Sequence, residues 1–165
     1  DVVGLNAERL IAGGSLAVDG VPAWVGLGYQ SGRSNSNTTH AIKAIVAKLD
    51  SHGSWATKDP RFSLTAREWL PVVGRDAVCI IALRHPLEFS STMLRYSRRL
   101  AMKHWGAIWL HYMGEMLRAC ASQPQIVVRH EAFVLRPEQT IAGLHTRLRL
   151  LSVQVPPLNT SSLSR

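Results

Sequence analysis

Long hydrophobic runs, cysteines and acidic residues are scarce in this sequence. No apolar run approaches the roughly 20 residues that a membrane-spanning helix needs, and the first residues lack a signal-peptide pattern. The two cysteines, Cys79 and Cys120, do not form a C-x-x-C pair, so nothing indicates a disulfide framework or a zinc site. We expect both to be free cysteines that act as small buried hydrophobic residues.

Positive charge exceeds negative charge by a wide margin. The chain has 19 lysines and arginines against 11 acids, a formal net charge of +8. Such an excess attracts nucleotides, nucleic acids and sulfated or phosphorylated ligands, without choosing among them. A length of 165 residues, with 46% hydrophobic and 18% charged residues, fits one globular domain with a real core.

Hydrophobic periodicity divides the chain into alternating helices and strands. We predict helices over 1–13, 40–50, 63–73, 86–99, 101–121 and 137–148, and strands over 55–58, 77–83 and 125–129. Residues 14–39 are rich in Gly, Ser and Asn and are predicted to form a loop. This alternation favours an α/β fold, a parallel sheet with helices on both faces, over residues 1–150, followed by a tail at 151–165.

The segment AVCIIALRHPLEFSSTML, residues 77–94, is the most informative part of the sequence. Its apolar run predicts a buried central strand that ends at Arg84, and Pro86 suits the first turn of the next helix. Ligands of open parallel sheets bind beyond the carboxyl ends of the strands, and a helix N-terminus favours anions. Because Arg84 offers a planar fork of donors, we predict a phosphate site here. Thr92 adds a hydroxyl if the chain curls back over it.

The segment RHPLEFSST resembles the 3'-phosphate-binding segment of sulfotransferases that use 3'-phosphoadenosine 5'-phosphosulfate (PAPS). In that family an Arg-x-Pro is followed by a Ser eight residues after the Arg. Arg84 and Pro86 match, and Thr92 stands in the place of the Ser.

Three further segments resemble a bacterial-type branch of the same family. WATKDPR at 55–61 is similar to its W-x-K-D-P-R segment, lengthened by one residue. Trp109 and Tyr112 match a W-x-x-Y, and IVVRHEAFVLRPEQTIAGL resembles V-V-x-Y-E-D-L-x-x-x-P-x-x-T-L, with His130 replacing Tyr and Ala132 replacing Asp. DVVGLNAERLIAGGS at 1–15 also resembles the helix that follows the nucleotide loop in these proteins, so the resemblance covers roughly residues 1–150.

The resemblance implies a three-layer, P-loop-NTPase-like α/β fold and transfer of sulfate from PAPS to an acceptor hydroxyl or amine, without a metal. It implies that Arg84 and Thr92 bind the cofactor, that Lys58 stabilises charge at the transferring or leaving group, and that Asp59 is a general base. A turn with a local ion pair is the alternative for Lys58-Asp59-Pro60-Arg61. Carbohydrate, lipid, small-molecule and peptide acceptors all stay open.

One departure from the family is large. Its first strand and Gly-rich loop, of the type P-x-S-G-T-[ST], have no counterpart here, so we expect an N-terminally truncated domain that begins after that loop. The sulfate-bearing end of the cofactor then lacks the loop that binds it. An active transferase and an inactive fragment both stay open for this chain alone.

Other interpretations stay open beside this one. A P-loop phosphotransferase, such as a kinase, needs a G-K-[ST] loop and acidic magnesium ligands upstream. A basic module for nucleic acid or another polyanion needs exposed aromatics beside its arginines; Trp105, Trp109 and Tyr112 instead form an apolar stripe, so we expect no nucleic-acid partner. Tyr112 has the alternative of lining an acceptor groove. We expect Glu131 to cap the following turn or to pair with an arginine such as Arg129 or Arg136, with a catalytic role as the alternative. The expected compartment is the cytoplasm, with the Golgi lumen as the alternative.

Overall fold

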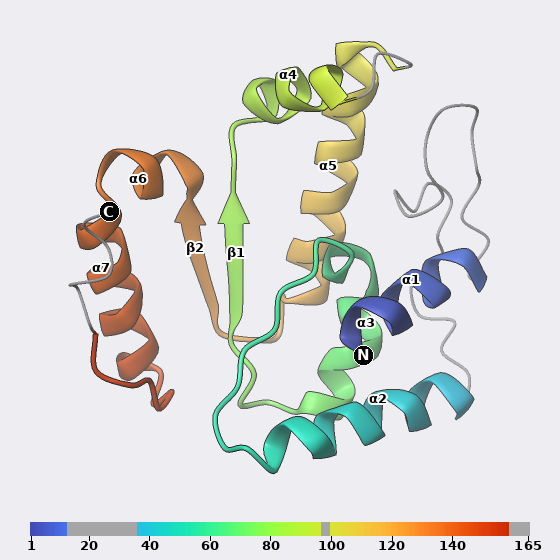
Figure 1. The fold of residues 1–165 in the computed structure, drawn as a ribbon, viewed down its shortest axis with the longest axis vertical. Helices are drawn as coiled ribbons and strands as arrows, with labels where there is room; N and C mark the ends of the chain where they lie inside the picture. Colours follow the sequence, from blue (N-terminus) through green and yellow to red (C-terminus); the bar gives the residue numbers. More distant parts are fainter. Residues whose placement is uncertain (13–35, 97–99, 159–165) are drawn as a thin grey trace.

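The computed structural model describes residues 1–12, 36–96 and 100–158. In that part of the chain it has a mixed α/β fold with helices around a small parallel sheet (Figure 1). The elements in chain order are α1 (Val2–Ala12), α2 (Ser36–Asp50), α3 (Phe62–Val73), β1 (Cys79–Leu83), α4 (Pro86–Tyr96), α5 (Met102–Ala119), β2 (Gln125–Arg129), α6 (His130–Leu135) and α7 (Pro137–Leu150).

The sheet consists of β1 and β2 within the described residues. The strands are parallel, with Cys79 opposite Gln125 and Leu83 opposite Arg129, so both end at the same edge (Figure 1). Helices α4 and α5 connect them. Since β1 has one neighbouring strand there and its Ile80 is 44% exposed, the expectation of a central strand buried on both faces is not met in this part of the chain.

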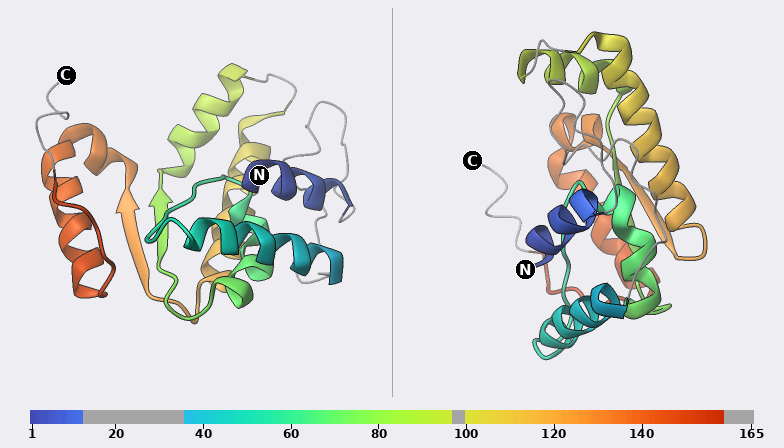
Figure 2. Two further views of the ribbon diagram at one scale, coloured as in Figure 1. Left: turned by 60° about the horizontal axis from the view of Figure 1, so that its bottom comes forward. Right: turned by 90° about the vertical axis from the view of Figure 1, so that its right-hand side faces the viewer.

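Two groups of helices supply most of the core. Helices α1, α2 and α3 pack around Ile42, Val46 and Trp69, at one side of the sheet (Figure 2). Helices α4 and α5 pack around Trp105 and Ile108. The predicted apolar stripe of α5 is confirmed at Trp105, which is 2% exposed. The packing of α3 on α5 joins the two groups.

The predicted strand over 55–58 is wrong. This segment has no regular secondary structure, because the described part of the chain offers it no neighbouring strand to pair with. Trp55 instead donates a hydrogen bond from Nε1 to Asp50 Oδ1 at 2.7 Å and packs beside the α2–α3 core. The segment is therefore a connection from α2 to α3.

Other boundaries differ in smaller ways. Helix α2 begins at Ser36, so residues 36–39 of the predicted loop are helical, while its residues 14–35 lie outside the described residues. The predicted helix over 86–99 ends at Tyr96, before residues 97–99, which are also outside. The short helix α6 was not predicted. It follows β2 directly, where the sequence indicated only a turn.

Cys79 and Cys120 form a disulfide, which corrects the expectation of two free cysteines. Their Cα atoms are 6.2 Å apart although 41 residues separate them in sequence. The crossover explains this proximity: α4 leads away from the end of β1, and α5 returns to the level at which β1 begins (Figure 1). A disulfide between such distant positions cannot be deduced from spacing alone.

Within residues 1–12, 36–96 and 100–158, no helix is both long and apolar enough to span a membrane.

Candidate anion-binding site at the carboxyl edge of the sheet

Arg84 lies immediately after β1, at the edge of the sheet where both strands end. Its Nε atom is shielded from solvent and has no hydrogen-bond partner among the described residues. The closest carboxylate is that of Glu88, one turn into α4, with Oε2 at 3.7 Å from Nε. The Arg84 side chain as a whole is 34% exposed, so an anion from solvent can reach it.

A hydrogen bond from α5 fixes the backbone at Arg84. Trp109 donates from its indole Nε1 to the carbonyl oxygen of Arg84 at 3.0 Å. The bond ties the end of β1 to the middle of α5. Sequence reasoning treated Trp109 as a core residue and missed this role, although its W-x-x-Y spacing placed Trp109 and Tyr112 on one face of the helix.

Residues of the chain itself partly cap the N-terminus of α4. Pro86 has no N–H, as suits the first helical position. The Leu87 N–H donates to Nδ1 of His85 at 3.3 Å, and the His85 N–H donates to Oε1 of Glu131 at 3.1 Å. His85 therefore caps the helix, a role that sequence reasoning did not assign to it.

Glu131 links the two strand ends. Besides accepting from His85, it pairs through Oε2 with Nε of Arg129 at 3.7 Å, which confirms the expected pairing with an arginine. The pKa of Glu131 is lowered, mainly by a hydrogen bond from its own backbone N–H, although desolvation acts in the opposite direction. The hydrogen bond from His85 and the charges of Arg129 and His130 lower it further. The carboxylate is thus held in its charged form.

Thr92 lies in the second half of α4. Helix α4 is continuous from Pro86 to Tyr96, so Thr92 is roughly 9 Å along the axis from Pro86. Its hydroxyl accepts a hydrogen bond from Nη2 of Arg95 at 3.4 Å. The described chain does not curl back to bring this hydroxyl to the start of the helix.

Lys58 and Asp59 precede α3, away from the α4 N-terminus. Lys58 is exposed, whereas Asp59 is 6% exposed. The Asp59 carboxylate accepts from the Arg61 N–H at 2.8 Å and pairs with Nη1 of Arg61 at 3.3 Å. Nη1 also donates to the Val3 carbonyl at 2.7 Å. The local ion pair that the sequence left open therefore forms, and Arg61 is a member that was not singled out.

Tyr112 adjoins the Asp59–Arg61 pair. Burial raises the pKa of Tyr112, with a smaller lowering by the Arg61 charge and a smaller raising by that of Asp59. The phenol is therefore held neutral. Because Trp109 contacts the Arg84 carbonyl and Tyr112 lies three residues later on α5, one helix positions both polar groups.

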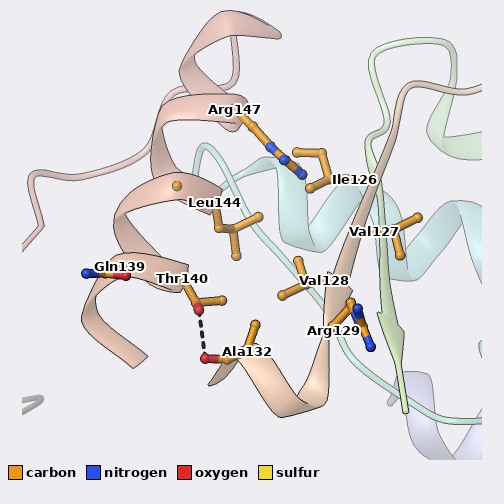
Figure 3. Close-up of a pocket in the computed structure, with 10 residues that line it drawn as sticks. Ile126, Val127, Val128, Arg129, Ala132, Gln139, Thr140, Leu144 and Arg147 are labelled. Atoms are coloured by element: carbon orange, nitrogen blue, oxygen red, sulfur yellow. Dashed lines mark hydrogen bonds between the residues drawn. The ribbon is translucent and has the colours of Figure 1, made fainter. Parts of the chain in front are cut away.

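A separate pocket of about 280 Å³ lies between β2 and helices α6 and α7 (Figure 3). Ile126, Val128 and Leu144 give it apolar walls, and Thr140 donates to the Ala132 carbonyl at 2.9 Å. None of the four predicted site residues, Lys58, Asp59, Arg84 and Thr92, lines this pocket.

The geometry at the carboxyl edge suits recognition of an anion. Arg84 has a buried guanidinium N–H without a hydrogen-bond partner among the described residues, although Glu88 in the first turn of α4 pairs with this arginine and opposes a second anion. Among the described residues, no group of three or more His, Cys, Asp or Glu side chains is placed to hold a metal ion.

Comparisons with protein-family models, with curated proteins and with solved structures each found no match to this chain.

Proposed function

We propose that Arg84 binds the 3'-phosphate of PAPS and that the chain is part of a sulfotransferase with the three-layer fold of that family. The observation that supports this most is the Nε atom of Arg84, which is shielded from solvent and lacks a hydrogen-bond partner in the described chain. A buried guanidinium N–H without a partner is unfavourable, and a phosphate oxygen would satisfy it. The order of the sequence motifs around Arg84 supports the nucleotide assignment.

Arg84 would hold the 3'-phosphate at the strand end, and the Trp109 bond to the Arg84 carbonyl would keep the backbone there in place. Thr92 would contact the phosphate only after a shift of α4, because its hydroxyl accepts a hydrogen bond from Arg95. PAPS, when bound, supplies an activated sulfuryl group. With PAPS bound, exposed Lys58 would stabilise negative charge on the phosphosulfate, and Asp59 would take the acceptor proton once its ion pair with Arg61 opens.

Glu88 competes with the ligand in this proposal. Its carboxylate pairs with Arg84 at 3.7 Å, so a phosphate must displace it or bind beside it. Both carboxylate and phosphate are negative, and their repulsion weakens binding. Removing the charge, as in Glu88→Gln, therefore raises affinity for the nucleotide while leaving Arg84 in place.

Calorimetry with adenosine 3',5'-bisphosphate and adenosine 5'-monophosphate tests the proposal. We expect the bisphosphate to bind about tenfold more tightly, as one charge-assisted contact implies, and Arg84→Ala to abolish that preference. Glu88→Gln is expected to strengthen bisphosphate binding. Arg149→Ala, at an exposed position on α7, is the control and leaves it unchanged.

Equal binding of both nucleotides by the wild-type chain contradicts the proposal. A preference for the bisphosphate that survives in Arg84→Ala contradicts the assignment of Arg84. In either case the basic module for another polyanion or the phosphotransferase becomes the better interpretation.

The disulfide bears on the compartment. Disulfides persist in oxidising environments and are rare in the cytosol. The Cys79–Cys120 bond therefore favours a lumenal or extracellular setting, such as the Golgi lumen, over the cytoplasm as the place where the parent protein acts.

A further inference from the structure

A second, larger pocket lies at the opposite end of the sheet from Arg84. Its volume is about 790 Å³, and its walls come from α3, the connection from α3 to β1, the end of α5 and the turn that leads to β2. Figure 1 places both connections at the end of the sheet where the strands begin. The pocket is thus independent of the site proposed for the nucleotide.

Three arginines from three different segments line this pocket: Arg67 from α3, Arg75 from the connection to β1, and Arg118 from the last turn of α5. Arg118 pairs with Glu115. Arg67 and Arg75 are exposed, and neither side chain forms a hydrogen bond or an ion pair within the part of the chain that the structure describes. None of the lining residues is acidic.

The walls of the pocket are held together covalently. The disulfide between Cys79 and Cys120 joins the start of β1 to the end of α5, directly beside the lining segments. The Cys79 N–H donates to the Pro124 carbonyl at 2.9 Å, and the Gln123 side chain reaches the Gly74 carbonyl at 3.4 Å. A ligand therefore meets arginines whose backbones are already fixed, which lowers the entropic cost of binding.

The field in the pocket favours a ligand with more than one negative charge. Helices α3 and α5 both end here, and their C-terminal dipoles together amount to roughly one negative charge. The two arginines without partners outweigh this charge. Guanidinium groups bind the oxygens of tetrahedral oxyanions through paired N–H donors.

We propose that this pocket binds a multiply charged ligand through its sulfate or phosphate groups, and that Arg67 and Arg75 are the residues that hold them. Under the proposed function this site is distinct from the cofactor site and does not depend on it. Arg118 contributes less, because Glu115 already neutralises it.

The test uses the Arg84→Ala chain, so that the site at the other edge of the sheet does not contribute. Inorganic pyrophosphate and a trisulfated heparin disaccharide are titrated separately by calorimetry. We expect at least one of them to bind, and Arg67→Ala or Arg75→Ala to weaken that binding about tenfold. Tighter binding of pyrophosphate identifies a phosphorylated ligand, and tighter binding of the disaccharide a sulfated one.

Arg149→Ala in the same background is the matched control. It removes one exposed arginine on α7, outside the pocket, and is expected to change affinity by less than about twofold. If neither probe binds, or if Arg149→Ala weakens binding as much as Arg67→Ala does, the pocket is not a specific anion site and the proposal is wrong. Because these residues are exposed, the variants are expected to fold, which circular dichroism checks.

Discussion

At the scale of single residues, Glu131 has the most consequential position outside the arginines. It accepts from the His85 N–H at the start of α4 and pairs with Arg129 at the end of β2. One carboxylate therefore ties together the two strand ends and the helix that follows β1. The lowered pKa of Glu131 means that these contacts favour its charged form.

This lowered pKa predicts a pH dependence of stability. Since the folded pKa of Glu131 lies below the unfolded value of about 4.3, its contribution is fully present above that value and is lost as pH falls through the folded pKa. We expect Glu131→Gln to be less stable than wild type at neutral pH, and the difference to shrink in acid. Urea unfolding at several pH values measures it.

Glu8→Gln is the matched control for this prediction. Glu8 is exposed on α1, and removing its charge is expected to leave stability nearly unchanged at every pH. If the difference in unfolding free energy between wild type and Glu131→Gln stays constant down to about pH 3, the Glu131 charge contributes nothing to stability.

The sequence predicted the positions of some residues better than others. A polar residue that ends an apolar parallel strand must lie at the carboxyl edge of the sheet, which is why the positions of Arg84 and Glu131 were predictable. Thr92 was expected to contact the ligand only if the chain curled back, and α4 is continuous over this segment. The contact of Arg61 with the Val3 carbonyl was missed, because Val3 comes from α1 and no local pattern shows such a contact.

At the scale of elements, a buried polar network joins α1 to α3. Arg9 donates from Nε and Nη2 to the two carboxylate oxygens of Glu68, at 2.8 and 3.1 Å. Asn6 accepts from Thr65 Oγ1 at 3.0 Å and from Trp69 Nε1 at 2.8 Å. These bonds, spaced along both helices, fix the register of α1 on α3.

The Arg9–Glu68 pair predicts strong non-additivity. Glu68→Leu leaves a buried guanidinium without its carboxylate, which we expect to cost about 3–5 kcal/mol of unfolding free energy. The double variant Arg9→Met/Glu68→Leu buries no unpaired charge, so its loss should be smaller than the sum of the single losses. Guanidinium unfolding of the wild type, Arg9→Met, Glu68→Leu and the double variant measures the coupling.

Glu115→Gln provides the comparison with an exposed pair. Glu115 pairs with Arg118 at the surface of α5, and breaking that pair is expected to cost less than about 1 kcal/mol. If the losses of unfolding free energy at Arg9 and Glu68 are additive, the two residues are not coupled. That result would contradict the claim that the buried network links α1 to α3.

Elements with strong local signals were predictable, and those that depend on distant partners were not. Helices α1, α3, α5 and α7 and strand β2 have periodic apolar residues, and the structure has them near the predicted bounds. The segment 55–58 has strand-like composition, but a strand forms only beside another strand. Helix α6 is six residues long, too short for periodicity to show.

At the scale of the whole molecule, the disulfide is the feature that sequence reasoning predicted wrongly. It encloses α4, α5 and the Arg84 corner in a loop closed between residues 79 and 120. Restriction of the unfolded chain by a loop of 41 residues is expected to contribute about 4 kcal/mol to stability.

Removing this cross-link should therefore destabilise the whole domain. We expect Cys79→Ala/Cys120→Ala, or reduction of the wild type, to lower the unfolding free energy by several kcal/mol, as guanidinium unfolding measures. Intact mass before and after reduction shows whether the bond is present. Two reactive thiols in the native, unreduced protein would contradict the bond itself.

Arginines lie at both ends of the sheet. Arg84 and Arg129 follow the strands, whereas Arg67, Arg75 and Arg118 surround the pocket near the strand starts. The net charge of +8 predicted an anionic partner, but composition cannot place charges in space. The proposed nucleotide and oxyanion sites thus use different arginines.

The most direct test of the central claim is the guanidinium Nε–Hε signal of Arg84 in proton–nitrogen correlation spectra, assigned by its loss in Arg84→Lys. During titration with adenosine 3',5'-bisphosphate, we predict that this signal moves more than those of Arg67 and Arg75, because a phosphate oxygen becomes the partner of the buried N–H. An Arg84 signal that stays in place while the nucleotide binds would contradict the account.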